Sequence, residues 1–190
     1  MKKTYIFNII SIAILVALAC VLSLFDRYIS MSIISIIPTI SLVFPYFKIG
    51  IANIIILIII YNFEFKYSLV AVILKSCILG IFALNGLTSF IIGFSGTILS
   101  YFVMYFLKKV NNKSYFMIFV SMAGGFSHSF GQICSSLMFY QTLNIQSFLL
   151  YSPFILLIGL ISGILIGLIT FKLNELIEKN NLIKNPPKNS

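Results

Sequence analysis

The sequence predicts an all-α integral membrane protein built as a bundle of six transmembrane helices, and three observations lead to this class. The chain of 190 residues is 60% hydrophobic. Its charged fraction is 9%, against roughly 25% in soluble domains. Its apolar residues form six runs, most of them near the roughly 20 residues that a helix needs to cross hydrocarbon. We expect one transmembrane domain over residues 1–190, with a short polar tail from about residue 173 to 190.

The six runs follow one another with short connections. They cover residues 5–25, 49–61, 67–84, 87–107, 115–140 and 148–171. The second run is short for a full span. We read the first run as an uncleaved span, although its start resembles a signal sequence. The chain is too short for an additional nucleotide-binding or catalytic module, so none is expected.

The segment 28–47 is apolar enough to span but contains Pro38 and Pro45. Positive charge decides its role, because lysine-rich flanks of membrane helices stay in the cytoplasm. Lysines at the amino terminus, around Lys108 and in the tail would all be cytoplasmic only if 28–47 does not cross. We therefore predict a re-entrant or capping segment on the outer face, buried against protein, and two cytoplasmic termini.

Small residues recur at helical spacing in three runs. They are Ala13 and Ala17; Ser89, Gly93, Gly96 and Ser100; and Gly159, Gly163 and Gly167. Lipid gives helices no hydrophobic reason to associate, and close backbone packing at small residues takes its place. In the fourth and sixth runs we interpret these residues as packing within the bundle. For the pair in the first run, docking onto another membrane subunit stays open.

The fifth run carries a polar stripe. Ser121, Gly125, His128, Gln132 and Ser135 fall on one narrow face of a helix. His128 is the single histidine of the chain. We expect this face to point into the bundle near the middle of the membrane. The alternative for His128 is a structural hydrogen bond to a neighbouring helix.

Lys75 lies near the centre of the third run, where insertion of a lysine costs about 2.5–3.5 kcal/mol. All four acidic residues are predicted at other depths, with Asp26 at the outer end of the first run. A buried cation without a carboxylate is neutral, bonded to carbonyl oxygens, or matched by an anionic ligand. With Lys48, Asn53 and the polar stripe, Lys75 predicts a polar ligand pocket. Snorkelling of Lys75 to the interface is the structural alternative.

Several function classes are not expected. The sequence has no clustered carboxylates for Mg²⁺, no Walker loop and no Cys/His cluster for zinc. We therefore expect neither a metal site nor catalysis in this chain. Cys20, Cys77 and Cys134 are predicted to be buried small apolar residues. The net charge of +9 comes mostly from the ends and one loop, which favours cytoplasmic flanks over a nucleic-acid surface.

Four stretches of the chain carry a family resemblance. They are FPYFKIGIANIIILIIIY (44–61), VILKSCILGIF (72–82), FSGTILSYFVMYFLKK (94–109) and GGFSHSFGQI (124–133). They resemble a bacterial membrane family named heptaprenyl diphosphate synthase component I, also called the Gx transporter family. The likeness covers most of the chain. It departs from the family pattern at Lys75, where arginine is expected, and at Ser129, where asparagine is expected.

The family is similar to the substrate-binding (S) components of energy-coupling-factor (ECF) transporters, which have six helices. The resemblance implies that Ala13 and Ala17 dock onto a transmembrane coupling protein driven by two ATPase subunits. ATP would be used only by those partners. Residues 26–47 would form an apolar outer loop over the substrate. The resemblance places the chain in the bacterial cytoplasmic membrane as a multi-pass protein.

Three functions follow from these observations. In the first, an ECF-type substrate-binding component, Lys48, Lys75 and His128 hold the anionic group of a small isoprenoid- or vitamin-like molecule, while Asn53 and Gln132 orient it. In the second, the chain is a non-catalytic membrane subunit beside the prenyltransferase catalytic subunit of heptaprenyl diphosphate synthase, in menaquinone side-chain synthesis. In the third, it is a structural membrane protein without a ligand.

Overall fold

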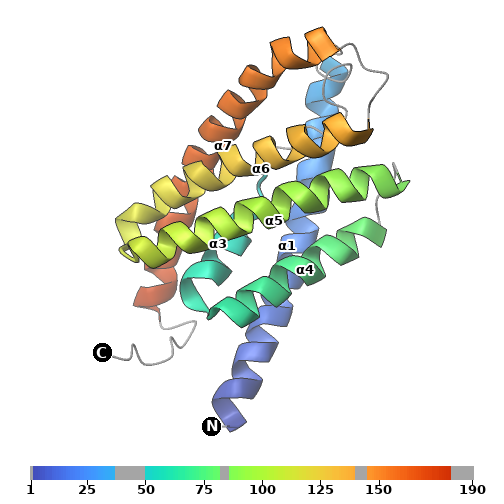
Figure 1. The fold of residues 1–190 in the computed structure, drawn as a ribbon. Coiled ribbons are helices and arrows are strands. Elements are labelled where there is room, and N and C mark those ends of the chain that lie inside the picture. Colours follow the sequence, from blue (N-terminus) through green and yellow to red (C-terminus); the bar gives the residue numbers. More distant parts are fainter. Residues whose placement is uncertain (1, 37–49, 82–85, 140–144, 181–190) are drawn as a thin grey trace.

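The computed structural model describes residues 2–36, 50–81, 86–139 and 145–180 (Figure 1). These stretches are helical and contain no strand. The helices are α1 (Lys2–Ile36), α3 (Asn53–Asn62), α4 (Phe65–Ile81), α5 (Gly86–Val110), α6 (Met117–Phe139) and α7 (Ile145–Lys179), with a short 3₁₀ helix at Ser114–Phe116. Each α-helix overlaps one of the six predicted runs, which confirms the all-α class.

Helix α3 lies at the centre of the fold, in contact with α1, α4, α5 and α7. Its residues Ile54–Ile60 are at most 8% exposed. A helix that is hydrophobic on every side is buried on every side, and this explains its unbroken run of isoleucine and leucine. With ten residues, α3 extends for about 15 Å. It therefore covers only about half of the roughly 30 Å hydrocarbon layer.

The carboxyl end of α3 is fixed by side chains of other helices. The last carbonyl groups of a helix have no partner within it. Lys108 of α5 donates from Nζ to the Ile60 carbonyl oxygen at 2.5 Å. Asn62 donates from Nδ2 to Oδ1 of Asn174 in α7 at 2.8 Å, and both side chains are buried. The short helix thus ends inside the protein, held by hydrogen bonds to α5 and α7.

Helices α5, α6 and α7 pack closely at glycines. A Cβ atom on Gly96 of α5 would lie 2.8 Å from the His128 carbonyl oxygen of α6. A Cβ atom on Gly163 of α7 would lie 2.7 Å from the Ser121 carbonyl oxygen of α6. Real Cβ atoms do not approach so closely, so only glycine permits these helix separations. Packing within the bundle is thereby confirmed for the glycines of the sixth run and for Gly96 of the fourth. It is wrong for Gly93, where a Cβ atom would have no neighbour within 4 Å.

The predicted small-residue pair of α1 faces away from the bundle. Ala13 and Ala17 are exposed, whereas Ile12, Val16 and Ala19 are buried. The buried set follows the helical repeat, so the two alanines lie on the outer side of α1. This orientation leaves their backbone accessible to lipid or to another membrane protein.

Helix α1 continues well beyond its predicted end near Phe25, to Ile36. The expectation of a loop from residue 26 onward is therefore wrong for residues 26–36. This stretch contains neither proline nor glycine, and the first residue that disfavours helix is Pro38. The remainder of the proposed outer loop, residues 37–47, lies outside the described residues.

Three of the described helical stretches are long and apolar enough to cross a membrane. They are Ile6–Ser32, Gly86–Val110 and Ser152–Lys179. The chain is accordingly a membrane protein, while the number of six spans and the orientation of the termini stay predictions. Of the shorter helices, α3 has ten residues and α4 has 17.

The three cysteines are free thiols. Cys20 is buried, as predicted, but Cys77 and Cys134 are exposed. Burial was the wrong expectation for these two, because they lie on the outward faces of α4 and α6. An apolar stretch of sequence does not distinguish a side chain that faces lipid from one that faces the protein interior.

Candidate functional site

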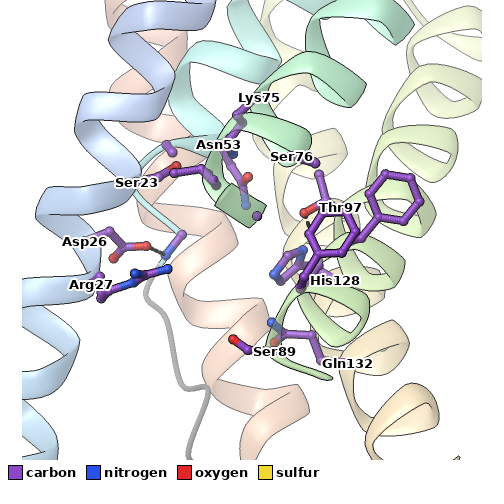
Figure 2. A pocket seen from close by; sticks show the side chains of 17 residues that line it. Ser23, Asp26, Arg27, Asn53, Lys75, Ser76, Ser89, Thr97, His128 and Gln132 are labelled. Atoms are coloured by element: carbon purple, nitrogen blue, oxygen red, sulfur yellow. Dashed lines mark hydrogen bonds between the residues drawn. The ribbon is translucent and has the colours of Figure 1, made fainter. Parts of the chain in front are cut away.

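A pocket of about 70 Å³ lies where α1, the start of α3, α4, α5 and α6 meet. Four of the five predicted site residues line it: Asn53, Lys75, His128 and Gln132. Figure 2 shows His128 and Gln132 on one side of the pocket, across from α1. The fifth predicted residue, Lys48, lies outside the described residues. The structure thus brings together side chains that are widely separated in the sequence.

The size of the pocket limits what it can enclose. One water molecule needs at least about 10–15 Å³ of such space, so about 70 Å³ holds several water-sized groups. Pockets that enclose a whole drug-sized ligand measure roughly 300–1,000 Å³. The pocket therefore fits a polar head group or a small anion, and any long apolar part of a ligand would have to lie elsewhere.

Lys75 reaches the pocket from the buried face of α4. This face also carries Ser68, Ala71 and Val72, at the spacing of a helical repeat. Lys75 is 5% exposed. Its side chain thus lies inside the bundle and not along the lipid-facing surface.

Asp26 is a site residue that sequence reasoning missed. It is 2% exposed, and its Oδ2 atom accepts a hydrogen bond from the Gly50 backbone N–H at 2.9 Å. Asp26 was expected at the outer end of the first run, at another depth than Lys75, but it lines the same pocket as that lysine. The error has a physical origin: α1 was expected to end before Asp26, which left this residue in an exterior loop.

A signal for the burial of Asp26 was present in the sequence. Six of the buried positions of α1 follow one another in alternating steps of four and three residues, with Cys20 buried beside them. The six are Ile12, Val16, Ala19, Ser23, Asp26 and Ser30. This spacing keeps all six on one helix face. If the buried face of the first run is continued past Ser23 with the same spacing, Asp26 falls on that face, against the bundle.

Helix α6 reaches the pocket because α5 has a glycine opposite it. A Cβ atom on Gly96 would lie 2.8 Å from Gln132 Cγ and 3.3 Å from His128 Cε1. Both side chains therefore approach α5 at this point. Nearer the amino end of α6, Gly125 and Ser121 of the predicted polar stripe pack against glycines of α7. The stripe follows the seam between α5 and α7, and only part of it faces the pocket.

An aromatic pair forms the apolar wall of the pocket. Phe90 and Phe94 of α5 both line it, and their ring centroids are 5.6 Å apart with planes inclined by 37°. Gly80 of α4 makes room for the first ring, since a Cβ atom there would lie 2.5 Å from Phe90 Cδ2. The pocket thus combines a charged and amide-bearing side with an aromatic side.

Basic side chains outnumber acidic ones in the pocket. Arg27 and Lys75 are the basic pair, and Asp26 is the one carboxylate among the described lining residues. Asn53 and Gln132 add amide groups that donate and accept hydrogen bonds. No group of three or more His, Cys, Asp or Glu side chains suited to a metal ion occurs in the described part of the chain. The arrangement suits recognition of an anionic group.

Comparison with known proteins identifies the family. A family model described as heptaprenyl diphosphate synthase component I matches residues 15–173. No curated protein and no solved structure matches the chain. The matched range contains every described residue that lines the pocket. The chain belongs to the heptaprenyl diphosphate synthase component I family.

Proposed function

We propose that the chain is a non-catalytic membrane subunit of a heptaprenyl diphosphate synthase, and that its pocket binds the diphosphate end of a prenyl diphosphate. The family supports the association with a synthase. One observation supports the binding role above all others: Lys75, 5% exposed, shares a pocket with Arg27, Asn53 and His128. Arg and Lys are the side chains that proteins use most for phosphate groups.

The dimensions of the pocket agree with a ligand that enters only by its head. A prenyl diphosphate has a compact anionic end and a long unsaturated chain. The pocket accepts a group of the size of the anionic end, next to the Phe90 and Phe94 rings. The prenyl tail of the ligand would lie along the apolar outer surfaces of the helices, which expose many large hydrophobic side chains.

The role of the pocket is tested by a binding measurement on the purified protein in lipid nanodiscs. Titration with a prenyl diphosphate, with the prenyl alcohol of equal length and with inorganic diphosphate separates recognition of the head from partition of the tail. Lys75→Gln should weaken diphosphate binding at least about tenfold, because one of two cations is lost. Lys109→Gln removes an exposed lysine at the end of α5 and should leave binding unchanged. Equal affinity for the alcohol and the diphosphate would refute a head-group site.

A second function, that of an ECF-type substrate-binding component, is favoured by the outward orientation of Ala13 and Ala17. Small residues on an exposed helix face permit close contact with another membrane protein. In this function the same pocket holds the anionic group of an isoprenoid- or vitamin-like molecule that is taken up. ATP-dependent uptake into proteoliposomes that contain the chain, a coupling protein and two ATPases supports this function, and uptake that is equal without the chain excludes it.

A further inference from the structure

The pocket contains the amino end of a half-membrane helix. Helix α3 begins at Asn53, and the turn before it, with Gly50 and Ala52, lines the pocket. The first amide groups of a helix lack partners within it and carry partial positive charge. Membrane proteins with interrupted helices direct such ends toward anionic substrate groups. An anion in this pocket would therefore find favourable contacts at the start of α3.

That place is taken by an anion of the protein itself. The Gly50 N–H donates to Asp26 Oδ2 at 2.9 Å. The next amides of the turn are used locally, since Asn53 N–H donates to the Gly50 carbonyl oxygen at 2.8 Å and Ile54 N–H to that of Ile51 at 3.1 Å. The Asp26 carboxylate thus holds the amide at the entrance to α3.

Glycine is required for this geometry. Gly50 has φ +91°, a conformation that residues with a side chain rarely adopt. It lets the chain turn into α3 beside α1, so that its N–H meets the carboxylate of Asp26. Arg27 follows Asp26 on α1, and both reach into the pocket from the same side (Figure 2). A carboxylate, two cations and a helix start are therefore gathered in one small space.

We propose that the Asp26 carboxylate is an internal competitor for the anion site, and that the anionic group of the ligand takes over its contact with the start of α3 and binds the basic side chains of the pocket. This inference rests on the proposed head-group site. The competition follows from charge and from size. A pocket of about 70 Å³ leaves little distance between two anions, and like charges at short range repel strongly. Ligand binding is then coupled to the release of the Asp26 carboxylate from the Gly50 N–H, because one anion replaces the other.

Asp26→Asn tests the competition directly. The amide keeps an oxygen that accepts from the Gly50 N–H but removes the negative charge. The variant should bind inorganic diphosphate and a prenyl diphosphate about tenfold more tightly than the wild type. Glu64→Gln is the matched control, because it removes one carboxylate at an exposed position between α3 and α4, and it should bind as the wild type does.

A second measurement uses the wild-type protein and does not depend on the variant folding. Asp26 is the only aspartate of the chain, so isotope-labelled aspartate gives a single carboxylate band in infrared difference spectra. Diphosphate should shift this band, and the prenyl alcohol of equal length should not. A band that stays in place while diphosphate binds overturns the inference, as does an equal shift with the alcohol.

The outcomes separate this inference from the proposed function. If the wild type binds diphosphate and Asp26→Asn binds it equally or more weakly, the competition is overturned and the head-group site stands. Diphosphate binding in Asp26→Asn that far exceeds the wild type supports the competition. Absence of binding in both proteins overturns the head-group site and the competition together.

Discussion

At the scale of single residues, Lys75 and Asp26 show how a membrane protein accommodates buried charge. Each is expensive alone in an apolar interior. Lys75 lies in a pocket that also receives Asp26, Arg27 and two amide side chains, and Asp26 accepts a backbone hydrogen bond. Charge is therefore concentrated in one polar site. Outside it, the buried surface of α3 is made of isoleucine and leucine, with Asn62 at its carboxyl end.

Gly96 is the residue whose replacement should disturb the structure most at the pocket. A methyl group there would meet Gln132 Cγ and the His128 carbonyl oxygen, both at 2.8 Å. One of these atoms is backbone, so α5 and α6 would have to separate. We expect Gly96→Ala to lower stability by about 1–3 kcal/mol, the usual range for overpacking, measured by thermal unfolding in one detergent.

Gly93 provides the control on the same helix, one turn earlier. A Cβ atom there would have no neighbour within 4 Å. Alanine is favoured over glycine within a helix by up to about 1 kcal/mol, so Gly93→Ala should leave the melting temperature unchanged or raise it. If both alanine variants lose the same stability, close packing at Gly96 is not the reason.

At the scale of helices, the position of α3 depends on polar contacts with its neighbours. Asn62 donates to Asn174 of α7 at 2.8 Å, and Asn174 donates in turn from Nδ2 to Glu178 Oε1 at 2.9 Å. The two asparagines are 5% and 2% exposed. These linked hydrogen bonds tie the ten-residue helix α3 to α7, which is long enough to cross a membrane.

The Asn62–Asn174 pair should show strong coupling in a double-mutant cycle. Asn174→Leu leaves the Asn62 amide with one of its two hydrogen bonds, and a buried polar group that loses its partner costs about 1–3 kcal/mol. Replacement of both asparagines by leucine should recover most of that loss, because no polar group is then stranded. Asn180→Leu, at the exposed end of α7, should have no effect. If the stability losses of the two single variants add up to the loss of the double variant, a direct contact between the two asparagines is contradicted.

At the scale of the whole molecule, the sequence predicted more of the helices than of their packing. Hydrophobic runs located all six described helices, because burial and lipid both demand apolar residues. Because faces toward lipid and faces toward the protein interior are both apolar, the sequence did not show which way each face points. The exposure of Cys77 and Cys134 could therefore not be predicted. Helical spacing did identify His128 and Gln132 as neighbours. It could not show that α5 and α7 divide the polar stripe between them.

The candidate site was predicted in part for a related reason. Asn53, Lys75, His128 and Gln132 stood out because polar residues are rare in apolar runs, and the structure places them around one pocket. Asp26 and Arg27 were missed because they follow the first run and look like a helix end in the sequence. Only the continuation of α1 to Ile36 brings them inside.

The outer face of α1 leads to a prediction about assembly. Ala13 and Ala17 are exposed on the helix that also supplies Asp26 from its buried side. A partner that docks there would touch the same helix on its outer face, and bulky residues would prevent close approach. We expect Ala17→Trp to abolish co-purification with a co-expressed partner while diphosphate binding is retained. The partners to compare are the synthase catalytic subunit and an ECF coupling protein.

Val70→Trp is the matched control for this experiment, because Val70 is exposed on α4. It adds the same bulk to another outer surface and should leave the complex intact. Since Ala17 does not line the pocket, a change in its partner contacts is separable from a change in ligand binding. Loss of the catalytic subunit assigns the α1 face to the synthase, and loss of the coupling protein assigns it to a transporter. Retention of both partners by Ala17→Trp would show that docking uses a different surface, and the outward alanines would then face only lipid.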